Sequence, residues 1–153
     1  EILIGLVGSE MCIRDSIGGI QDSPFAQTQC PDLILSEHST WKRIYLHRMK
    51  HSEICIASTG LHQSSGWKIA EYLAAGRAIV SEPLCYEVPG PFQAGENYLT
   101  YTSADGCIEQ IRTLLAHPEQ ILQMGQRNRA YYDTWLRPDQ IVTKALEQAK
   151  ILL

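Results

Sequence analysis

Residues 54–81 read ICIASTGLHQSSGWKIAEYLAAGRAIVS, and this stretch decides the fold. Its first part, Ile54 to Ala57, is a short apolar run that opens into a Ser-Thr-Gly turn, which is typical of a buried strand. Trp67 to Ala75 has the apolar spacing of a helix, and Ala78 to Val80 is a second apolar run without polar alternation. This order predicts a strand-helix-strand unit with parallel strands and places the chain in the α/β class.

The ends of the central helix carry their own signals. Ser64 or Ser65 is the expected N-terminal cap, because a hydroxyl oxygen can accept a hydrogen bond from the first free backbone N–H groups. Gly76 lies just past the last helical residue, where the chain commonly adopts a left-handed conformation. We therefore expect the helix to stop at Gly76 and to lead directly into the second strand.

The flanking sequence adds further elements. Residues 17–39 are rich in Gly, Pro, Gln and Ser and are expected to be mostly loop, after which Thr40 is expected to cap a helix at 41–51 whose basic residues face solvent. Residues 82–96 hold three prolines and two glycines and predict a long surface excursion. The remaining predicted elements are a strand at 97–102 and helices at 103–116, at 118–136 and from 138 to the end.

Composition excludes several classes of protein. The chain has 153 residues, with 13 Lys and Arg against 17 Asp and Glu, so it lacks the basic excess that a phosphate backbone requires and nucleic acid is not an expected partner. Its apolar runs are far shorter than the ~20 residues of a membrane-spanning helix. Five cysteines without a CxxC pair indicate neither a disulfide framework nor a zinc site, and predict reduced, mostly buried thiols in a cytoplasmic protein.

The N-terminus has a different character. Residues 6–16 read LVGSEMCIRDS and resemble a translated sequencing-library adapter. We therefore expect residues 1–16 to be non-native and to add little to the fold, and residues 17–153 to be part of a domain whose upstream sequence is missing. Without the resemblance, Ile2 to Val7 would be interpreted as a strand that runs into a Gly-Ser turn.

The loop from Gly60 to Gly66 is the best candidate for a ligand site. It follows a strand and precedes a helix, and ligands of open parallel sheets bind outside the carboxyl ends of the strands. The helix start offers free N–H groups and a partial positive charge to an anion. Its spacing matches neither GxGxxG nor a Walker A loop, so neither a nicotinamide cofactor nor ATP is indicated.

Two charged residues interrupt the otherwise apolar central helix. Lys68 and Glu71 lie three apart on one face, roughly in line with Ser64. A lysine in the first turn is at the unfavourable end of the helix dipole, which costs roughly 0.3–1 kcal/mol, and a bound diphosphate would offset this cost. The alternative is a solvated Lys68–Glu71 pair on an exposed stripe.

A family resemblance bears on this choice. Residues 60–81 resemble the donor-site signature of GT-B-fold glycosyltransferases, in their carboxyl-terminal Rossmann-like domain, where a Gly-containing loop leads into a helix with a Glu, then Ala-x-Gly and a strand. Val88-Pro89-Gly90, Asn97-Tyr98-Leu99 and Tyr131-Tyr132 extend the similarity, which covers roughly Tyr45 to Leu146. The resemblance implies a Rossmann-like parallel sheet flanked by helices, part of a GT-B carboxyl-terminal domain.

The resemblance also implies roles for individual residues. Glu71 matches the second Glu of the family's motif of two Glu separated by seven residues, which binds the ribose hydroxyls of the nucleotide, and a carboxylate can accept hydrogen bonds from two vicinal hydroxyls. The first Glu of the motif is replaced here by Gln63, an amide without negative charge. Ser64, Ser65 and Gly66 fall where the loop meets the diphosphate and sugar.

Weaker candidates come from the residues themselves. Lys68 is close enough in sequence to contact a diphosphate, His62 could touch the sugar, and Glu82 follows the second strand at the expected edge of the sheet, whereas Trp67 is expected in the core. The candidate donor site is therefore His62, Gln63, Ser64, Ser65, Gly66, Lys68, Glu71 and Glu82.

The implied function is transfer of a sugar from a nucleoside-diphosphate donor to an unknown acceptor, with no metal or cofactor. The implied partners are the nucleotide sugar and an amino-terminal acceptor domain outside this chain. Two alternatives stay open. One is a nucleotide-sugar epimerase of the same fold, and the other is a non-catalytic binding or interaction module, which the replacement at Gln63 favours.

Overall fold

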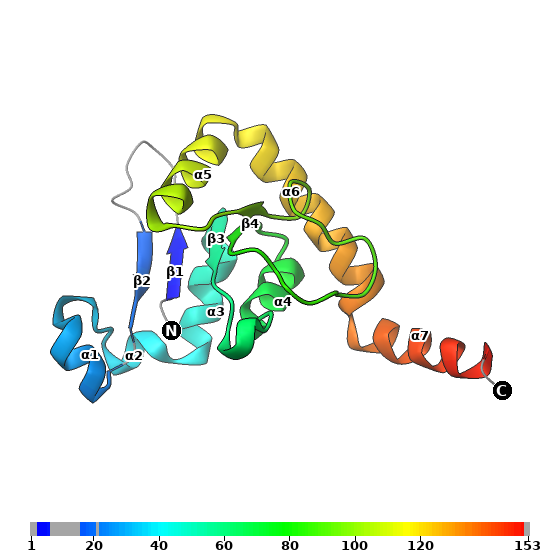
Figure 1. Cartoon of the computed structure of the whole chain (residues 1–153), viewed down its shortest axis with the longest axis horizontal. Coiled ribbons are helices and arrows are strands. Elements are labelled where there is room, and N and C mark those ends of the chain that lie inside the picture. The colour runs from blue at the N-terminus through cyan, green and yellow to red at the C-terminus, as the bar shows by residue number, and fades with distance from the viewer. Residues whose placement is uncertain (1–2, 7–15, 21, 152–153) are drawn as a thin grey trace.

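The computed structural model describes residues 3–6, 16–20 and 22–151 (Figure 1). Its elements in chain order are β1 (Leu3–Leu6), β2 (Ser16–Gly19), α1 (Pro24–Gln29), η2 (Pro31–Leu33), α2 (Glu37–Thr40), α3 (Lys42–His51), β3 (Ile54–Ala57), η3 (Leu61–Gln63), α4 (Trp67–Ala74), β4 (Ala78–Ser81), β5 (Leu99–Thr100), α5 (Ala104–Ala116), α6 (Pro118–Tyr131), the π-helical turn η4 (Tyr132–Leu136) and α7 (Pro138–Ile151).

The sheet has the order β2-β1-β3-β4-β5. β3 pairs in parallel with β4, from Ile54 opposite Ala78 to Ala57 opposite Ser81, and β4 pairs in parallel with β5. The predicted strand-helix-strand unit and the α/β class are therefore confirmed. β1 is antiparallel to both β2 and β3, so the parallel part of the sheet consists of β3, β4 and β5.

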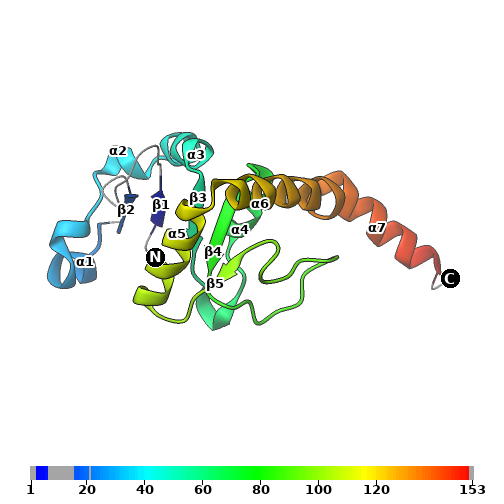
Figure 2. The same ribbon diagram turned by 90° about the horizontal axis from the view of Figure 1, so that it is seen from above.

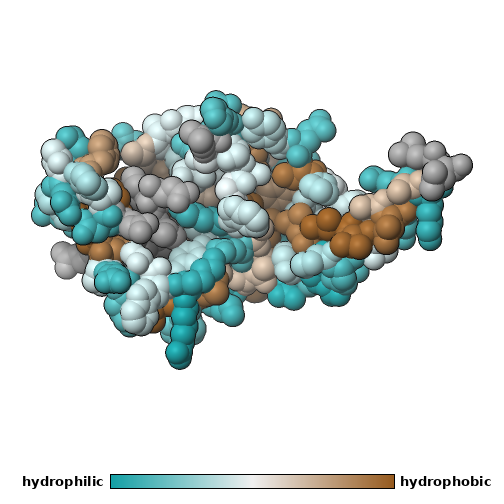
Figure 3. Space-filling model, turned by 90° about the horizontal axis from the view of Figure 1, so that it is seen from below, coloured by the Kyte–Doolittle hydropathy of each residue, from teal (hydrophilic) through white to brown (hydrophobic). Residues whose placement is uncertain are grey.

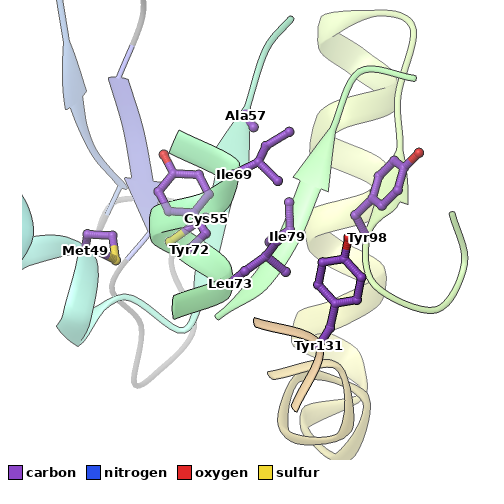
Figure 4. Close-up of a cluster of buried hydrophobic side chains, with 9 residues drawn as sticks. All are labelled: Met49, Cys55, Ala57, Ile69, Tyr72, Leu73, Ile79, Tyr98 and Tyr131. Atoms are coloured by element: carbon purple, nitrogen blue, oxygen red, sulfur yellow. The ribbon is translucent and has the colours of Figure 1, made fainter. Parts of the chain in front are cut away.

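The side chains of β3 and β4 divide the core into two halves. Cys55, Ala57 and Ile79 pack with Tyr72 and Leu73 of α4, together with Met49, Ile69, Tyr98 and Tyr131 (Figure 4). The alternate residues, including Ile54, Ile56 and Val80, pack on the other face against α5 and α6. Since both faces are covered by helices, the two strands lack polar alternation, as the sequence predicts.

The C-terminal end of α4 follows the sequence prediction closely. Gly76 has φ of +63°, and the N–H groups of Gly76 and Arg77 donate to the carbonyls of Leu73 and Tyr72 at 3.0 Å each. This pair of hydrogen bonds is the Schellman motif. A β-carbon at Gly125 of α6 would lie 2.5 Å from the Gly76 carbonyl oxygen, so glycine at position 125 permits the close approach of α6.

The segment before α3 is more ordered than predicted. Residues 17–39 include β2, α1, η2 and the start of α2, so the expectation of a mostly irregular loop is wrong. Ser23 caps α1 by accepting from the N–H of Ala26 at 3.1 Å. Thr40 does not cap α3, because it ends α2 and its hydroxyl donates to the Glu37 carbonyl at 2.6 Å.

The elements after β4 are of the predicted types, but their lengths differ from the predicted ones. The excursion at 82–96 contains no regular strand or helix, as expected, and it is anchored near its middle, where the Tyr131 hydroxyl donates to the Pro89 carbonyl. Gly90 adopts a φ of +75° against the ring of Trp135, with no room for a side chain. The predicted strand at 97–102 is shorter, since only Leu99–Thr100 pair with β4.

The last helix of the chain extends away from the sheet. α6 continues through η4 into α7, and α7 projects beyond the rest of the molecule in both ribbon views (Figures 1 and 2). Hydrophobic side chains gather on this projecting helix (Figure 3), where Ile141, Val142 and Leu146 are all exposed. In the described ranges, no helix combines the length and the apolar character needed to cross a membrane.

The cysteines depart in part from the expected burial. Cys55 is buried and its thiol pKa is raised to about 12, chiefly by desolvation. Cys30 and Cys107 are only half-buried and Cys85 is exposed, so the expectation of mostly buried thiols is wrong. All four are free thiols, and Cys12 lies outside the described residues.

β1 falls within residues 1–16, which are expected to be non-native because residues 6–16 resemble an adapter. The structure pairs Leu3–Leu6 with β2 and β3, which agrees with the strand expected for this segment when the resemblance is set aside. Residues 7–15, which hold most of the adapter-like sequence, lie outside the described residues. The non-native origin of residues 1–16 stays a prediction.

Deletion of residues 1–16 tests this origin. If they are not native, a chain that begins at Ile17 retains β3–β5 and α3–α7 and should melt within a few degrees of the full chain. Thermal unfolding followed by circular dichroism measures the difference. A much lower midpoint would show that pairing of β1 with β3 is part of the native fold.

Candidate functional site

The side chain of Glu82, one of the residues predicted for the ligand site, joins the carboxyl ends of β3 and β4. The Glu82 Oε2 atom accepts hydrogen bonds from the backbone N–H and the hydroxyl of Thr59, each at 2.7 Å. These two bonds lower the pKa of Glu82 from its ordinary value, with the hydroxyl bond as the larger cause. Glu82 therefore lies at the predicted edge of the sheet and fixes the start of the loop there.

The loop between β3 and α4 is folded back on itself. The Gly60 N–H donates to the Ser64 carbonyl at 2.8 Å, and the Gln63 N–H donates to the Gly60 carbonyl at 3.0 Å. His62 and Gln63 both have positive φ, 56° and 61°, a conformation that non-glycine residues rarely adopt. The Tyr86 hydroxyl donates to the His62 carbonyl at 3.1 Å, so the excursion after β4 supports this turn.

The N-terminus of α4 differs from the prediction in two respects. Gly66, and neither Ser64 nor Ser65, is the N-cap residue, and no side chain caps the helix there. Both serines are exposed. Trp67 is 90% exposed, so the prediction that it belongs to the core is wrong. Trp67 is the first residue of α4 and lies outside the core cluster that includes Ile69 and Tyr72 of the same helix.

Glu71 has a partner that the sequence did not predict. Its Oε1 atom forms an ion pair with Nζ of Lys42, the first residue of α3, and its side chain is 26% exposed. The expected Lys68–Glu71 pair is not the one that forms, although Lys68 lies one turn earlier on the same helix. Lys42 is likewise not simply part of a solvated basic face.

Comparison with known proteins identifies the family. A family model described as glycosyl transferase-like matches residues 27–147, which span β3, β4 and the loop between them. The chain belongs to this glycosyl transferase-like family. A search of curated proteins gave no match.

The glycosyl transferase-like domain thus has its polar groups concentrated at one edge of the sheet. The loop presents backbone amides and the exposed hydroxyls of Ser64 and Ser65, and the uncapped start of α4 adds N–H donors. Such a set is suited to an anion. Glu71 adds a carboxylate one turn into the helix, which is suited to accept hydrogen bonds from hydroxyl groups.

Three residues of this edge were missed by sequence reasoning. Thr59 and Tyr86 hold the loop through hydrogen bonds to Glu82 and to the His62 carbonyl, and no local pattern predicts either contact. Lys42 could have been noticed, because a cation at the first position of a helix is electrostatically unfavourable and implies a compensating group.

Glu82→Gln should destabilise the domain in a pH-dependent way. The carboxylate has a lowered pKa in the folded state, so its contribution is present above the pKa of the unfolded chain and is lost as the pH falls through the folded value. We expect a loss of about 1 kcal/mol in the free energy of unfolding at neutral pH, the scale of a hydrogen bond to a charged group with partial exposure, and a smaller loss as the pH falls through the folded pKa of Glu82. Urea unfolding of both proteins at several pH values measures this loss of stability.

Glu87→Gln is the matched control, since Glu87 lies on the same excursion and is exposed. It should leave the unfolding free energy unchanged at every pH. An equal loss in both variants, or a loss in Glu82→Gln that persists in acid, would show that the Thr59–Glu82 hydrogen bonds do not stabilise the edge.

Proposed function

We propose that this chain is the donor-binding part of a GT-B-type glycosyltransferase that transfers a sugar from a nucleoside-diphosphate sugar to an acceptor. The observation that carries the proposal is the position of Glu71, which lies one turn into the helix that follows the loop at the carboxyl edge of β3. Membership of the glycosyl transferase-like family supports it. In the proposed complex the Glu71 carboxylate accepts hydrogen bonds from the ribose hydroxyls.

The diphosphate of the donor would lie against the start of α4. The backbone N–H groups there have no capping side chain, and the helix dipole favours a negative charge at this position. Ser64, Ser65 and Gly66 line the approach, and Lys68 on the first turn supplies a positive charge. His62 and Gln63, both exposed, are placed to meet the sugar.

The acceptor would bind to an amino-terminal domain outside this chain, as the family resemblance implies. The 90% exposure of the Trp67 side chain supports a surface that faces a ligand or a second domain, because a tryptophan gains stability from burial. We also propose a cytoplasmic location, which the four free thiols of the described residues support.

A non-catalytic binding module is the second candidate. It is favoured by Gln63, which stands at the position of the first motif Glu and brings no negative charge to the sugar. Such a module would bind the nucleotide through Glu71 and the start of α4 but would not transfer the sugar. We expect this chain to be inactive on its own under either proposal, so a transfer assay with several nucleotide sugars, carried out on the protein that includes the proposed amino-terminal domain, distinguishes the two.

Glu71→Gln should weaken binding of a nucleoside diphosphate by about 1.5–3 kcal/mol, because the amide cannot accept from both ribose hydroxyls as a carboxylate does. Isothermal titration with UDP, GDP and ADP measures the loss. Folding should change by less than about 1 kcal/mol, since the lost ion pair with Lys42 is partly exposed to solvent.

Glu96→Gln provides the control for loss of a surface ion pair. Glu96 precedes β5 and forms an ion pair with Arg127 at 3.4 Å. Loss of this ion pair should leave the nucleotide affinity unchanged. If wild type and Glu71→Gln bind every nucleoside diphosphate equally, or if wild type binds none, the proposed donor site is wrong.

Donor binding should also be independent of metal ions. The loop from Gly60 to Gly66 supplies amides, hydroxyls and an imidazole, and divalent magnesium and calcium ions prefer carboxylate and carbonyl oxygens. Titration of the same nucleoside diphosphate with and without EDTA should give equal dissociation constants. Binding that disappears with EDTA would show that a cation bridges the diphosphate to the protein.

A further inference from the structure

The ion pair between Lys42 and Glu71 joins two helices that are far apart in the sequence. The two residues are 29 positions apart, Lys42 at the start of α3 and Glu71 in the middle of α4. α3 ends shortly before β3, and the ion pair brings the first residue of α3 beside α4, the helix that follows β3 and the loop at 60–66.

Stability gives little reason for this contact. The Lys42 side chain is 65% exposed, and an ion pair with so much access to water contributes little to the free energy of folding. Lys42 also occupies an unfavourable position for a cation, because α3 has no acidic residue in its first turn to offset the helix dipole. The Glu71 carboxylate is the group that compensates this charge.

The Lys42 end of the ion pair also lies over the ring of Tyr45. Lys42 Nζ lies 5.1 Å from the centre of the Tyr45 ring, one turn along α3. The Tyr45 hydroxyl is buried and has no hydrogen-bond partner among the described residues. Burial, followed by the neighbouring Tyr72 and Glu71, raises the pKa of Tyr45, so the phenol stays neutral beside the carboxylate.

We propose that Lys42 is a positioning residue for nucleotide binding, which holds Oε1 of Glu71 so that the carboxylate is already oriented toward the ribose when the donor arrives. This inference rests on the proposed function. Orientation before binding removes the entropy cost of ordering the side chain in the complex. Lys42 acts through Glu71 and does not touch the diphosphate, so its contribution depends on the ribose hydroxyls.

A double-mutant cycle tests the proposal by isothermal titration of the full chain. The probes are the ribonucleoside diphosphate, among UDP, GDP and ADP, that binds wild type most tightly, and its 2′,3′-dideoxy analogue. Lys42→Met should weaken the ribonucleotide about tenfold, equivalent to about 1.4 kcal/mol, and leave the dideoxy analogue unchanged. The same change in a Glu71→Gln background should have no further effect. Lys42→Arg, which retains the charge, should recover most of the affinity.

Arg43→Met is the matched control, since Arg43 is the next residue of α3, is exposed and carries the same charge. It should not change the affinity of either probe. Equal affinities of wild type and Lys42→Met for the ribonucleotide would overturn the positioning role while leaving the proposed function intact. Equal losses for both probes, or a loss that persists with Glu71→Gln, would also overturn it and show direct contact with the diphosphate. Absence of binding to wild type would overturn both proposals.

Discussion

The parallel pairing of β3 with β4 is the constraint on which the rest of this structure depends. Parallel neighbours cannot be joined by a tight turn, so the chain must cross over through α4 and return to the same end of the sheet. The crossover brings the start of α4 beside the carboxyl ends of both strands. The concentration of amides, hydroxyls and carboxylates at this edge therefore follows from the topology.

The same topology explains why charge is tolerated on one side of α4 and excluded from the side that faces the strands. Tyr72 and Leu73 are enclosed by the strands, whereas Glu71 lies on the side of α4 that faces α3 and retains partial access to water. A carboxylate at this position keeps much of its hydration and has a lysine beside it. Such a carboxylate does not carry the large desolvation penalty of a fully buried charge.

Much of the fold could be predicted from the sequence, because its signals are local. The apolar runs of β3 and β4 and the glycine after α4 each follow from a few adjacent residues. α1 was missed because six residues are too few to show a hydrophobic period, although Ser23 and Pro24 mark its start. The candidate site was predicted less completely. The residue type of Trp67 favours the core, and only the structure shows that this first residue of α4 is exposed.

The first half of the excursion at 82–96 is fixed at its beginning and at its end. Glu82 holds its beginning to Thr59, while Pro89 and Gly90 are held against Tyr131 and Trp135 of the C-terminal helices. Between these anchors the chain is largely exposed and forms no ladder with the sheet. Because loop-closure entropy grows slowly with length, relatives of this domain can gain or lose residues in this interval without disturbing the sheet, and differences in their substrate preference can accumulate there.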